Sequence, residues 1–184
     1  AREACDRTGA ALIFDEVQTG MGRTGTLWAY QGTGVVPDAL TSAKGLGGGL
    51  PIGALVTGSR LADALQPGDH GSTFAGGPVA CAAALVALEL CSDPKLLASV
   101  VELGERLAEA LRELPGVVAV RGRGLMRAID LGGASAPEIA RRALLEQRLI
   151  VNATGPATIR LEPPLIVEAA EIDDAVARLG ALLS

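Results

Sequence analysis

The sequence predicts an α/β protein, with part of a mainly parallel sheet layer followed by a small C-terminal α+β domain. In the first half, short continuous apolar runs end in acidic or other polar residues, which is typical of buried parallel strands. All four aromatic residues lie at or before Phe74, and the aliphatic remainder alternates strand and helix patterns. We therefore expect one domain part over residues 1–92, and a connecting helix with a small domain over residues 93–184.

Each element of the first half has a local signal. Residues 1–7 have the pattern of the end of an amphipathic helix, and Gly9 suits the position that caps it. Pro78 favours a helix start, because the N–H that proline lacks is not needed there. We expect helices at 78–91 and from Pro94 to about Leu114, the second capped by Ser92 or Asp93, and strands at 10–14, 39–42 and 53–57.

The second half alternates short apolar runs with longer helical patterns. Gly122 and Gly124 separate two apolar runs and predict a pair of strands joined by a tight turn. The expected elements are strands at 117–121, 125–131, 149–151 and 158–161, and helices at 137–147 and 168–183.

Composition excludes several classes of function. The chain of 184 residues is 49% hydrophobic and has a net charge of −5, so it can form a core and does not suit a nucleic-acid or anionic-membrane surface. A single histidine, His70, leaves no basis for a histidine metal site. Three cysteines without disulfide or metal spacing favour a reducing cytoplasm. The helix pattern at the first residue indicates a start partway through a larger domain.

Lys44 is unusual for this chain, which has two lysines and 14 arginines. It lies between small residues and a glycine-rich segment, residues 41–49. An amine can lose its proton and attack a carbonyl carbon, which a guanidinium cannot do. The residue type therefore indicates a chemical role for Lys44 beyond positive charge.

Asp15 and Lys44 each follow a predicted strand, and Ser72–Thr73 precedes a predicted helix start, with 29 residues from Asp15 to Lys44 and 29 from Lys44 to Thr73. Parallel strands bring such residues together at the carboxyl edge of a sheet. An amine, a buried carboxylate and hydroxyl groups near a helix start suit pyridoxal phosphate, whose aldehyde, ring nitrogen and phosphate they would bind.

Two other interpretations of the first half compete with this one. Gly20–Gly25 fits the dinucleotide pattern G-x-G-x-x-G, but no helix pattern follows it, and a glycine-rich hairpin is favoured. Asp15–Glu16 after an apolar strand also fits the magnesium site of a P-loop-type ATPase. Local sequence leaves that second alternative open.

Several motifs together resemble the class III aminotransferases, which are pyridoxal-phosphate enzymes of fold type I. The motifs are FDEVQTG at 14–20, GRTG at 22–25, KGLGGG at 44–49, PIGA at 51–54 and GSTF at 71–74. RGRGLM at 121–126, IVN at 150–152 and IRLEPPL at 159–165 are most similar to the acetylornithine aminotransferase subgroup. The resemblance covers the whole chain but only the C-terminal half of a family member, so residues 1–92 would be the end of the cofactor-binding large domain.

The resemblance implies a role for each motif residue in the first half. Lys44 would hold the cofactor covalently and then transfer the substrate proton, and Asp15 would pair with the ring nitrogen. Val17 would pack on the ring and Gln18 would bond to its phenolic oxygen. Glu16 would be structural, since one carboxylate is enough for the ring nitrogen.

The resemblance also implies binding roles for residues outside that strand edge. Thr73, next to Ser72, would reach the cofactor phosphate of a partner chain in a homodimer. Arg160 would bind the substrate carboxylate with its planar fork. Gly77 stands where the family usually has asparagine, which leaves the phosphate side less defined. No metal site is expected.

The function implied is transfer of an amino group from N2-acetyl-L-ornithine to 2-oxoglutarate, giving N-acetyl-L-glutamate 5-semialdehyde and L-glutamate, as in arginine biosynthesis. Alternatives within the class are ornithine, succinylornithine, acetyl-lysine and 4-aminobutyrate aminotransferases. The ATPase remains the alternative from another class. The upstream half would supply the phosphate loop, an aromatic ring stacked on the cofactor and a second substrate arginine, so these 184 residues alone are expected to be inactive.

Overall fold

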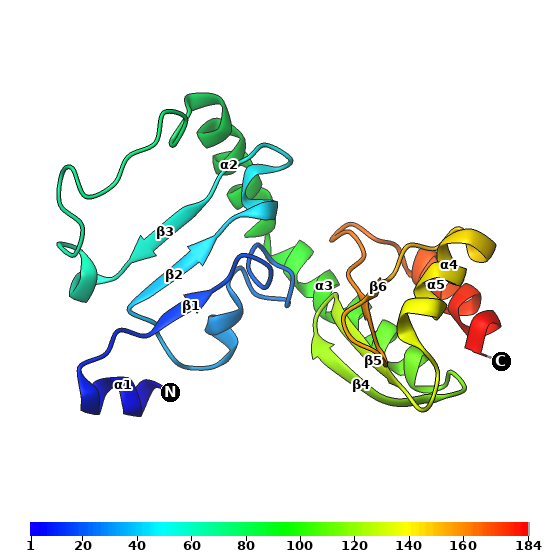
Figure 1. Cartoon of the computed structure of the whole chain (residues 1–184). Helices are drawn as coiled ribbons and strands as arrows, with labels where there is room; N and C mark the ends of the chain where they lie inside the picture. The colour runs from blue at the N-terminus through cyan, green and yellow to red at the C-terminus, as the bar shows by residue number, and fades with distance from the viewer. Residues whose placement is uncertain (184) are drawn as a thin grey trace. The chain divides into compact units, whose positions relative to one another are not determined.

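The computed structural model describes residues 1–183, and the chain divides into two compact units. The first unit contains residues 1–22 and 26–97, and the second contains residues 23–25 and those from 98 onward. Each unit combines a β-sheet with helices (Figure 1), which confirms the predicted α/β class. Within residues 1–183, no helix is both long enough and apolar enough to cross a membrane.

The first unit is built on a three-stranded sheet in the order β1 (Ile13–Asp15), β2 (Ala39–Ser42) and β3 (Ala54–Thr57). β1 and β2 are parallel, with Ile13 opposite Ala39 and Asp15 opposite Thr41. β3 runs antiparallel to β2, unlike the parallel layer that the sequence predicted. The link from β2 to β3 holds only the short 3-10 helix η2 (Lys44–Gly47), and a parallel return requires a longer crossover.

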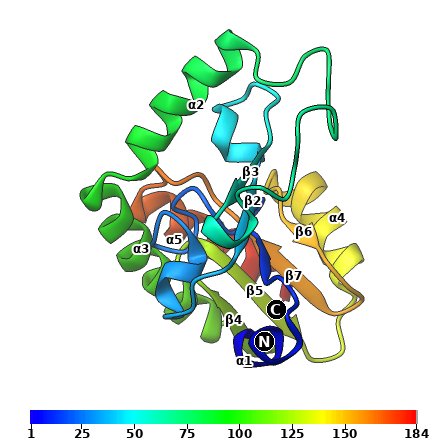
Figure 2. The ribbon, with the colours of Figure 1, turned by 90° about the vertical axis from the view of Figure 1, so that its left-hand side faces the viewer.

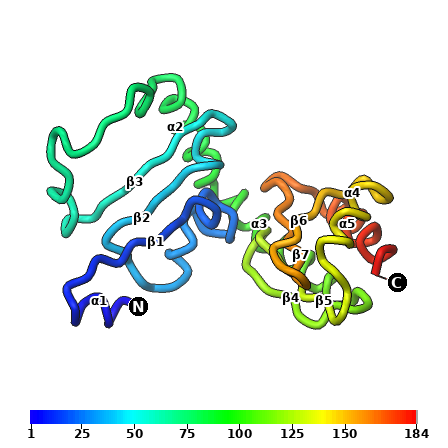
Figure 3. The backbone as a smooth tube through the Cα atoms, in the orientation of Figure 1, coloured from blue at the N-terminus to red at the C-terminus, as the bar shows by residue number. Residues whose placement is uncertain are grey.

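Helices and one long loop complete the first unit. α1 (Arg2–Thr8) ends at Gly9, whose φ of 75° provides the left-handed cap predicted there. The short 3-10 helices η1 (Ala29–Gly32) and η3 (Ser59–Leu61) follow β1 and β3. Figure 3 traces residues 62–77 as a long connection from η3 to α2 (Pro78–Cys91).

The helix α3 (Pro94–Arg112) begins in the first unit and continues in the second. Asp93 caps its start, because its Oδ1 accepts a 2.8 Å hydrogen bond from the backbone N–H of Lys95. Of the two predicted caps, Ser92 and Asp93, it is therefore Asp93 that takes this role.

The second unit contains an antiparallel sheet in the order β4 (Val117–Arg123), β5 (Met126–Leu131), β7 (Thr158–Leu161) and β6 (Asn152–Ala153). α4 (Ala136–Gln147) lies beside β6 and β7, as Figure 2 shows, and α5 (Ala169–Leu183) packs against α4. The predicted strand at 149–151 lies slightly later, at β6.

One face of this sheet forms the main core. Along β5 and β7, every second residue is buried, so the apolar side chains of Ile129, Leu131, Ile159 and Leu161 share that face. They pack with buried residues of α3, α4 and α5. Side chains on the alternate positions of β5 and β7 belong to the opposite face of the sheet.

The backbone of the turn between β4 and β5 lies unusually close to the backbone of α3. A Cβ added at Gly104 in α3 would lie 2.2 Å from the carbonyl oxygen of Gly124. Arg127, only 5% exposed, fastens the same turn by donating to the carbonyl oxygens of Gly124 and Gly122 and to Glu105. Close approach of α3 to this turn therefore requires glycine at position 104.

This contact predicts that Gly104→Ala lowers the free energy of unfolding by about 1–3 kcal/mol, since the backbone must shift to relieve the overlap. Gly180→Ala is the matched control, because it is also a helix glycine but its Cβ would meet only the flexible end of Leu114, at 3.0 Å. Alanine there is expected to cost nothing or to stabilise by up to about 1 kcal/mol. Urea denaturation measures both, and equal effects of the two variants would contradict the proposed close approach.

Candidate active site

The carboxyl edge of β1 and β2 brings Asp15 next to the end of β2. Asp15 is opposite Thr41, whose hydroxyl donates to Asp15 Oδ1 at 3.1 Å. The backbone N–H of Val17 donates to the same oxygen at 3.0 Å. Among the described residues, none donates to Oδ2, which leaves this oxygen available to an external donor.

Asp15 is exposed in this chain, so the prediction of a buried carboxylate is wrong for residues 1–183. The difference has a simple physical reason, because Asp15 is the last residue of its strand and lies beyond the apolar part of β1. Its orientation comes instead from the two hydrogen bonds to Oδ1 and from the strand register.

Lys44 lies two residues after the end of β2, and its Nζ donates a 2.8 Å hydrogen bond to Oε1 of Gln18. The bond joins the segment after β1 to the segment after β2, so the structure brings Asp15, Gln18 and Lys44 to one strand edge. Lys44 is exposed, and its φ of 49° lies in the left-handed region. This conformation costs a residue with a side chain on the order of 1 kcal/mol or more, and such strain is concentrated at functional sites.

The neighbours of Lys44 hold this conformation in place. Leu46, in the same short helix η2, is buried against Met21 and Ala84. Gly48 ends η2 in the left-handed conformation, with φ of 57°. The glycine-rich segment thus packs closely enough to fix the lysine backbone while leaving its amine accessible.

Glu16 is only 3% exposed, and its carboxylate is fully engaged in local structure. Its oxygens accept hydrogen bonds from the Thr19 hydroxyl at 2.5 Å and from the backbone N–H groups of Ala29 and Tyr30 at 3.1 and 2.8 Å. These contacts confirm the structural role predicted for Glu16. They also count against a magnesium site at Asp15–Glu16, and no cluster of potential metal ligands occurs in residues 1–183.

The glycine-rich segment Gly20–Gly25 is a series of turns, so the predicted two-stranded hairpin is wrong. Gly22 and Gly25 have φ of 84° and 91°, and the N–H of Gly22 donates to the Leu27 carbonyl oxygen at 3.2 Å. These positive φ values coil the chain where a hairpin needs extended strands. No helix follows Gly25, so this is not a dinucleotide-binding loop either.

Ser72 and Thr73 lie on the exposed connection between η3 and α2, together with His70. Within the described residues, none of their side chains bonds to Asp15, Gln18 or Lys44. The helix start at Gly77 has no side-chain cap. The structure therefore groups three of the predicted first-half residues and leaves the two hydroxyl residues on the surface.

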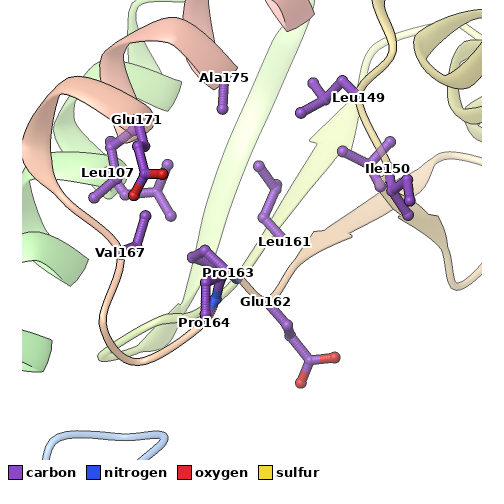
Figure 4. Close-up of a pocket in the computed structure, with 12 residues that line it drawn as sticks. Leu107, Leu149, Ile150, Leu161, Glu162, Pro163, Pro164, Val167, Glu171 and Ala175 are labelled. Carbon is purple, nitrogen blue, oxygen red and sulfur yellow. The ribbon is translucent and has the colours of Figure 1, made fainter.

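Arg160 belongs to the second unit, in β7, and two polar side chains contact its guanidinium. Nη2 donates to Oδ1 of Asn152 at 3.0 Å, and Nε lies 3.0 Å from Oε2 of Glu162. Next to it, twelve residues line a cavity of about 300 Å³, mostly apolar, and Figure 4 shows the Glu162 carboxylate directed away from its apolar side chains. Sequence reasoning missed Asn152, which meets Arg160 through strand pairing, and Glu162, which follows the end of β7 two residues after Arg160.

Comparison with known proteins agrees with these motifs over the whole chain. The family model "Aminotransferase class-III" matches residues 1–183. The acetylornithine aminotransferase of Thermosynechococcus vestitus is 48% identical over 100% of this chain, which covers 46% of that protein. The acetylornithine aminotransferase of Corynebacterium efficiens is 49% identical over 100% of this chain and 45% of its own length. The chain thus spans about half the length of the curated relatives it matches.

Solved structures with the same fold include enzymes of two substrate types. The ornithine aminotransferase of Toxoplasma gondii has a TM-score of 0.89 and 35% identity, over 99% of this chain and 45% of that one. The N-acetylornithine aminotransferase of Stenotrophomonas maltophilia has a TM-score of 0.87 and 37% identity, over 99% and 49%. Another structure of the Toxoplasma enzyme contains pyridoxal phosphate at partial occupancy in its active site.

The buried carboxylate of Glu16 gives a stability prediction. Glu16→Gln keeps the size of the side chain but offers only one acceptor oxygen to three donors, so at least one of them is left unsatisfied. We expect the free energy of unfolding to fall by about 1–3 kcal/mol. Glu89→Gln, at an exposed position of α2, is the control and should change stability by less than about 0.5 kcal/mol. Chemical denaturation distinguishes the two, and equal stability of both variants would show that Glu16 does not organise this loop.

Proposed function

Because this chain belongs to the class III aminotransferase family, we propose that its protein transfers the terminal amino group of N2-acetyl-L-ornithine to 2-oxoglutarate. The products would be N-acetyl-L-glutamate 5-semialdehyde and L-glutamate, a step of arginine biosynthesis. The main support for an amino-group transfer is the position of Lys44, whose backbone is strained and whose amine lies at the same strand edge as Asp15 and Gln18. The choice of substrate is supported by the names of the curated relatives, since those with 48% and 49% identity over the whole chain are acetylornithine aminotransferases.

Pyridoxal phosphate is the cofactor of this family, and the residues at the strand edge fit it. When bound, it supplies an aldehyde carbon for an amine and an electron-withdrawing ring that accepts negative charge. The chain offers an accessible amine on Lys44 and an unused carboxylate oxygen on Asp15, and two hydrogen bonds orient that carboxylate. Both groups are of the chemical types that such a cofactor requires.

Lys44 would carry out the proton transfers of the reaction. Its Nζ is the nucleophile toward a carbonyl carbon when unprotonated and can then accept and return a proton as a general base. The short helix η2 fixes its backbone, so the amine has a defined origin for both tasks. Gln18 would hold the amine in position in the resting protein.

Asp15 would hold a proton at the cofactor ring nitrogen. Its Oδ2 is the oxygen left for that hydrogen bond, because Oδ1 already accepts from Thr41 and Val17. A negative carboxylate keeps a neighbouring ring nitrogen protonated, which favours withdrawal of electrons from the substrate. Val17, half-buried beside Asp15, would pack against the ring, and Gln18 would bond to its phenolic oxygen.

We further propose that Ser72 and Thr73 complete a phosphate site in a homodimer, where Thr73 would reach the cofactor of the partner chain. Their exposure on a long loop, and the 90% exposure of the adjacent Phe74, support a role in assembly. Gly77 supplies no side-chain cap at the following helix, so this phosphate site would rely on hydroxyl and backbone N–H groups. A cytoplasmic location is part of this proposal.

Arg160 would bind the carboxylate of the substrate, since a planar guanidinium pairs with both oxygens of a carboxylate. The same role fits ornithine, succinylornithine, acetyl-lysine or 4-aminobutyrate as alternative donors. The likeness to the ornithine aminotransferase structure makes ornithine the alternative most directly supported. Comparing turnover with acetylornithine and ornithine in the protein expressed from its complete reading frame decides between them.

The assignment of Lys44 can be tested by labelling. Pyridoxal phosphate and borohydride are added to the protein expressed from its complete reading frame, and the modified peptide is identified by mass spectrometry. We expect the label at Lys44, because borohydride fixes the cofactor to the amine that holds it. Lys95→Ala is a matched control, since Lys95 lies at the start of α3 and is the other lysine of these 184 residues. Equal labelling in Lys44→Ala would refute the assignment.

Residues 1–184 expressed alone should bind pyridoxal phosphate weakly and show no useful turnover. The reason is that Asp15 and Lys44 are both exposed in this chain, so little excludes water from the reacting groups. Cofactor titration by absorbance and a glutamate-release assay measure the two properties. Turnover comparable to that of the protein from the complete reading frame would contradict this expectation.

A further inference from the structure

Two side chains, those of Asn152 and Glu162, contact the guanidinium of Arg160. Asn152 lies opposite Arg160 on the neighbouring strand β6, and Glu162 lies two residues along the chain from Arg160. Period-two alternation places Arg160 on the sheet face opposite the helical core, because Ile159 and Leu161 are buried in that core. Glu162 follows the last residue of β7, and its carboxylate lies 3.0 Å from the Arg160 guanidinium. Asn152 and Glu162 thus approach one guanidinium from the adjacent strand and from its own chain.

The contacts engage two of the three nitrogens of the guanidinium, Nε and Nη2. A guanidinium binds acceptors along the edge formed by Nε and Nη2, or along the end formed by Nη1 and Nη2. Glu162 is 3.0 Å from Nε, and Asn152 accepts one of the two hydrogens of Nη2, which leaves Nη1 and the second Nη2 hydrogen for another acceptor. The Nε atom is buried, and its N–H is not aimed at the Glu162 oxygen, so this contact acts through charge. No residue in the range 1–183 accepts from Nη1.

These observations point to an oriented carboxylate receptor, and we propose that Asn152 and Glu162 are positioning residues for Arg160. Asn152 fixes the plane of the guanidinium, so that the Nη1 and Nη2 end is presented to a substrate carboxylate. Glu162 is an internal carboxylate that lowers the affinity of Arg160 for a second one. The inference rests on the proposed function of Arg160 in substrate binding.

The two residues should therefore have opposite effects on carboxylate affinity. Asn152 is a neutral acceptor, so its loss removes orientation without removing negative charge. Glu162 is only 23% exposed and the Arg160 side chain 27%, so the charge between them is partly shielded from water. Replacing Glu162 by glutamine keeps the length of the side chain and removes the competing charge.

The test measures steady-state kinetics of transamination in the protein expressed from its complete reading frame. Asn152→Ala should raise KM for 2-oxoglutarate by about two- to tenfold, the loss of one hydrogen bond. Glu162→Gln should lower this KM by about two- to fivefold, as expected for a partly exposed charge pair. The value of kcat at saturation should stay unchanged in both variants, because only binding changes. Glutarate, an unreactive dicarboxylate, should protect Glu162→Gln against thermal unfolding more than the unmodified protein, and Asn152→Ala less.

Asp130→Asn is the matched control. Asp130 lies on the same sheet, pairs with Arg121 and accepts from Thr158 of β7, but has no contact with Arg160 among the described residues. Its KM should equal that of the unmodified protein. An unchanged KM in either test variant, or a rise in Glu162→Gln, would overturn the proposal. If the unmodified protein does not transaminate, the proposed function itself is wrong. If it does transaminate and Arg160→Lys raises KM for 2-oxoglutarate while the Asn152 and Glu162 variants do not behave as expected, Arg160 binds the carboxylate and only the roles of Asn152 and Glu162 are wrong.

Discussion

The parallel pairing of β1 with β2 is the constraint on which the candidate site depends. Asp15 opposite Thr41 sets the register, and the N–H of Glu16 continues the pairing by donating to the Thr41 carbonyl oxygen at 2.9 Å. A shift of one residue would turn each side chain to the other face of the sheet. With this register fixed, the chain after β1 and the chain after β2 emerge at one edge, where the amine of Lys44 meets Gln18.

Local structure then divides the work between neighbouring residues. Glu16 is buried and binds the loop that follows it, while Asp15 stays exposed with one oxygen unused by the described residues. Two adjacent carboxylates thus have different roles because one points into the loop and the other lies at the strand end. The side chain also explains why a strained backbone is kept at Lys44. A glycine would avoid the strain of the positive φ but could not supply an amine.

Much of this could be predicted from the sequence because it depends on short-range patterns. Apolar runs, Pro78 and Gly9 give the strands, the start of α2 and the end of α1, and strand ends give the neighbourhood of Asp15 and Lys44. The antiparallel β3 and the coiled segment after Gln18 were not predictable in this way. The direction of β3 follows from the short connection between β2 and β3, which does not allow a parallel return. The turns after Gln18 depend on the buried carboxylate of Glu16, which accepts hydrogen bonds from residues 19, 29 and 30. Asn152 meets Arg160 only through the pairing of β6 with β7, which no motif encodes.

The central claim is that the amine at this strand edge performs the chemistry of amino-group transfer. A half-reaction tests it most directly: the cofactor-loaded protein from the complete reading frame is mixed with N2-acetyl-L-ornithine without 2-oxoglutarate, and the semialdehyde product is measured. The account predicts about one product molecule per site for the unmodified protein, and almost none for Lys44→Ala until a small primary amine is added to replace the missing group. Product release by Lys44→Ala at the unmodified rate without added amine would contradict it.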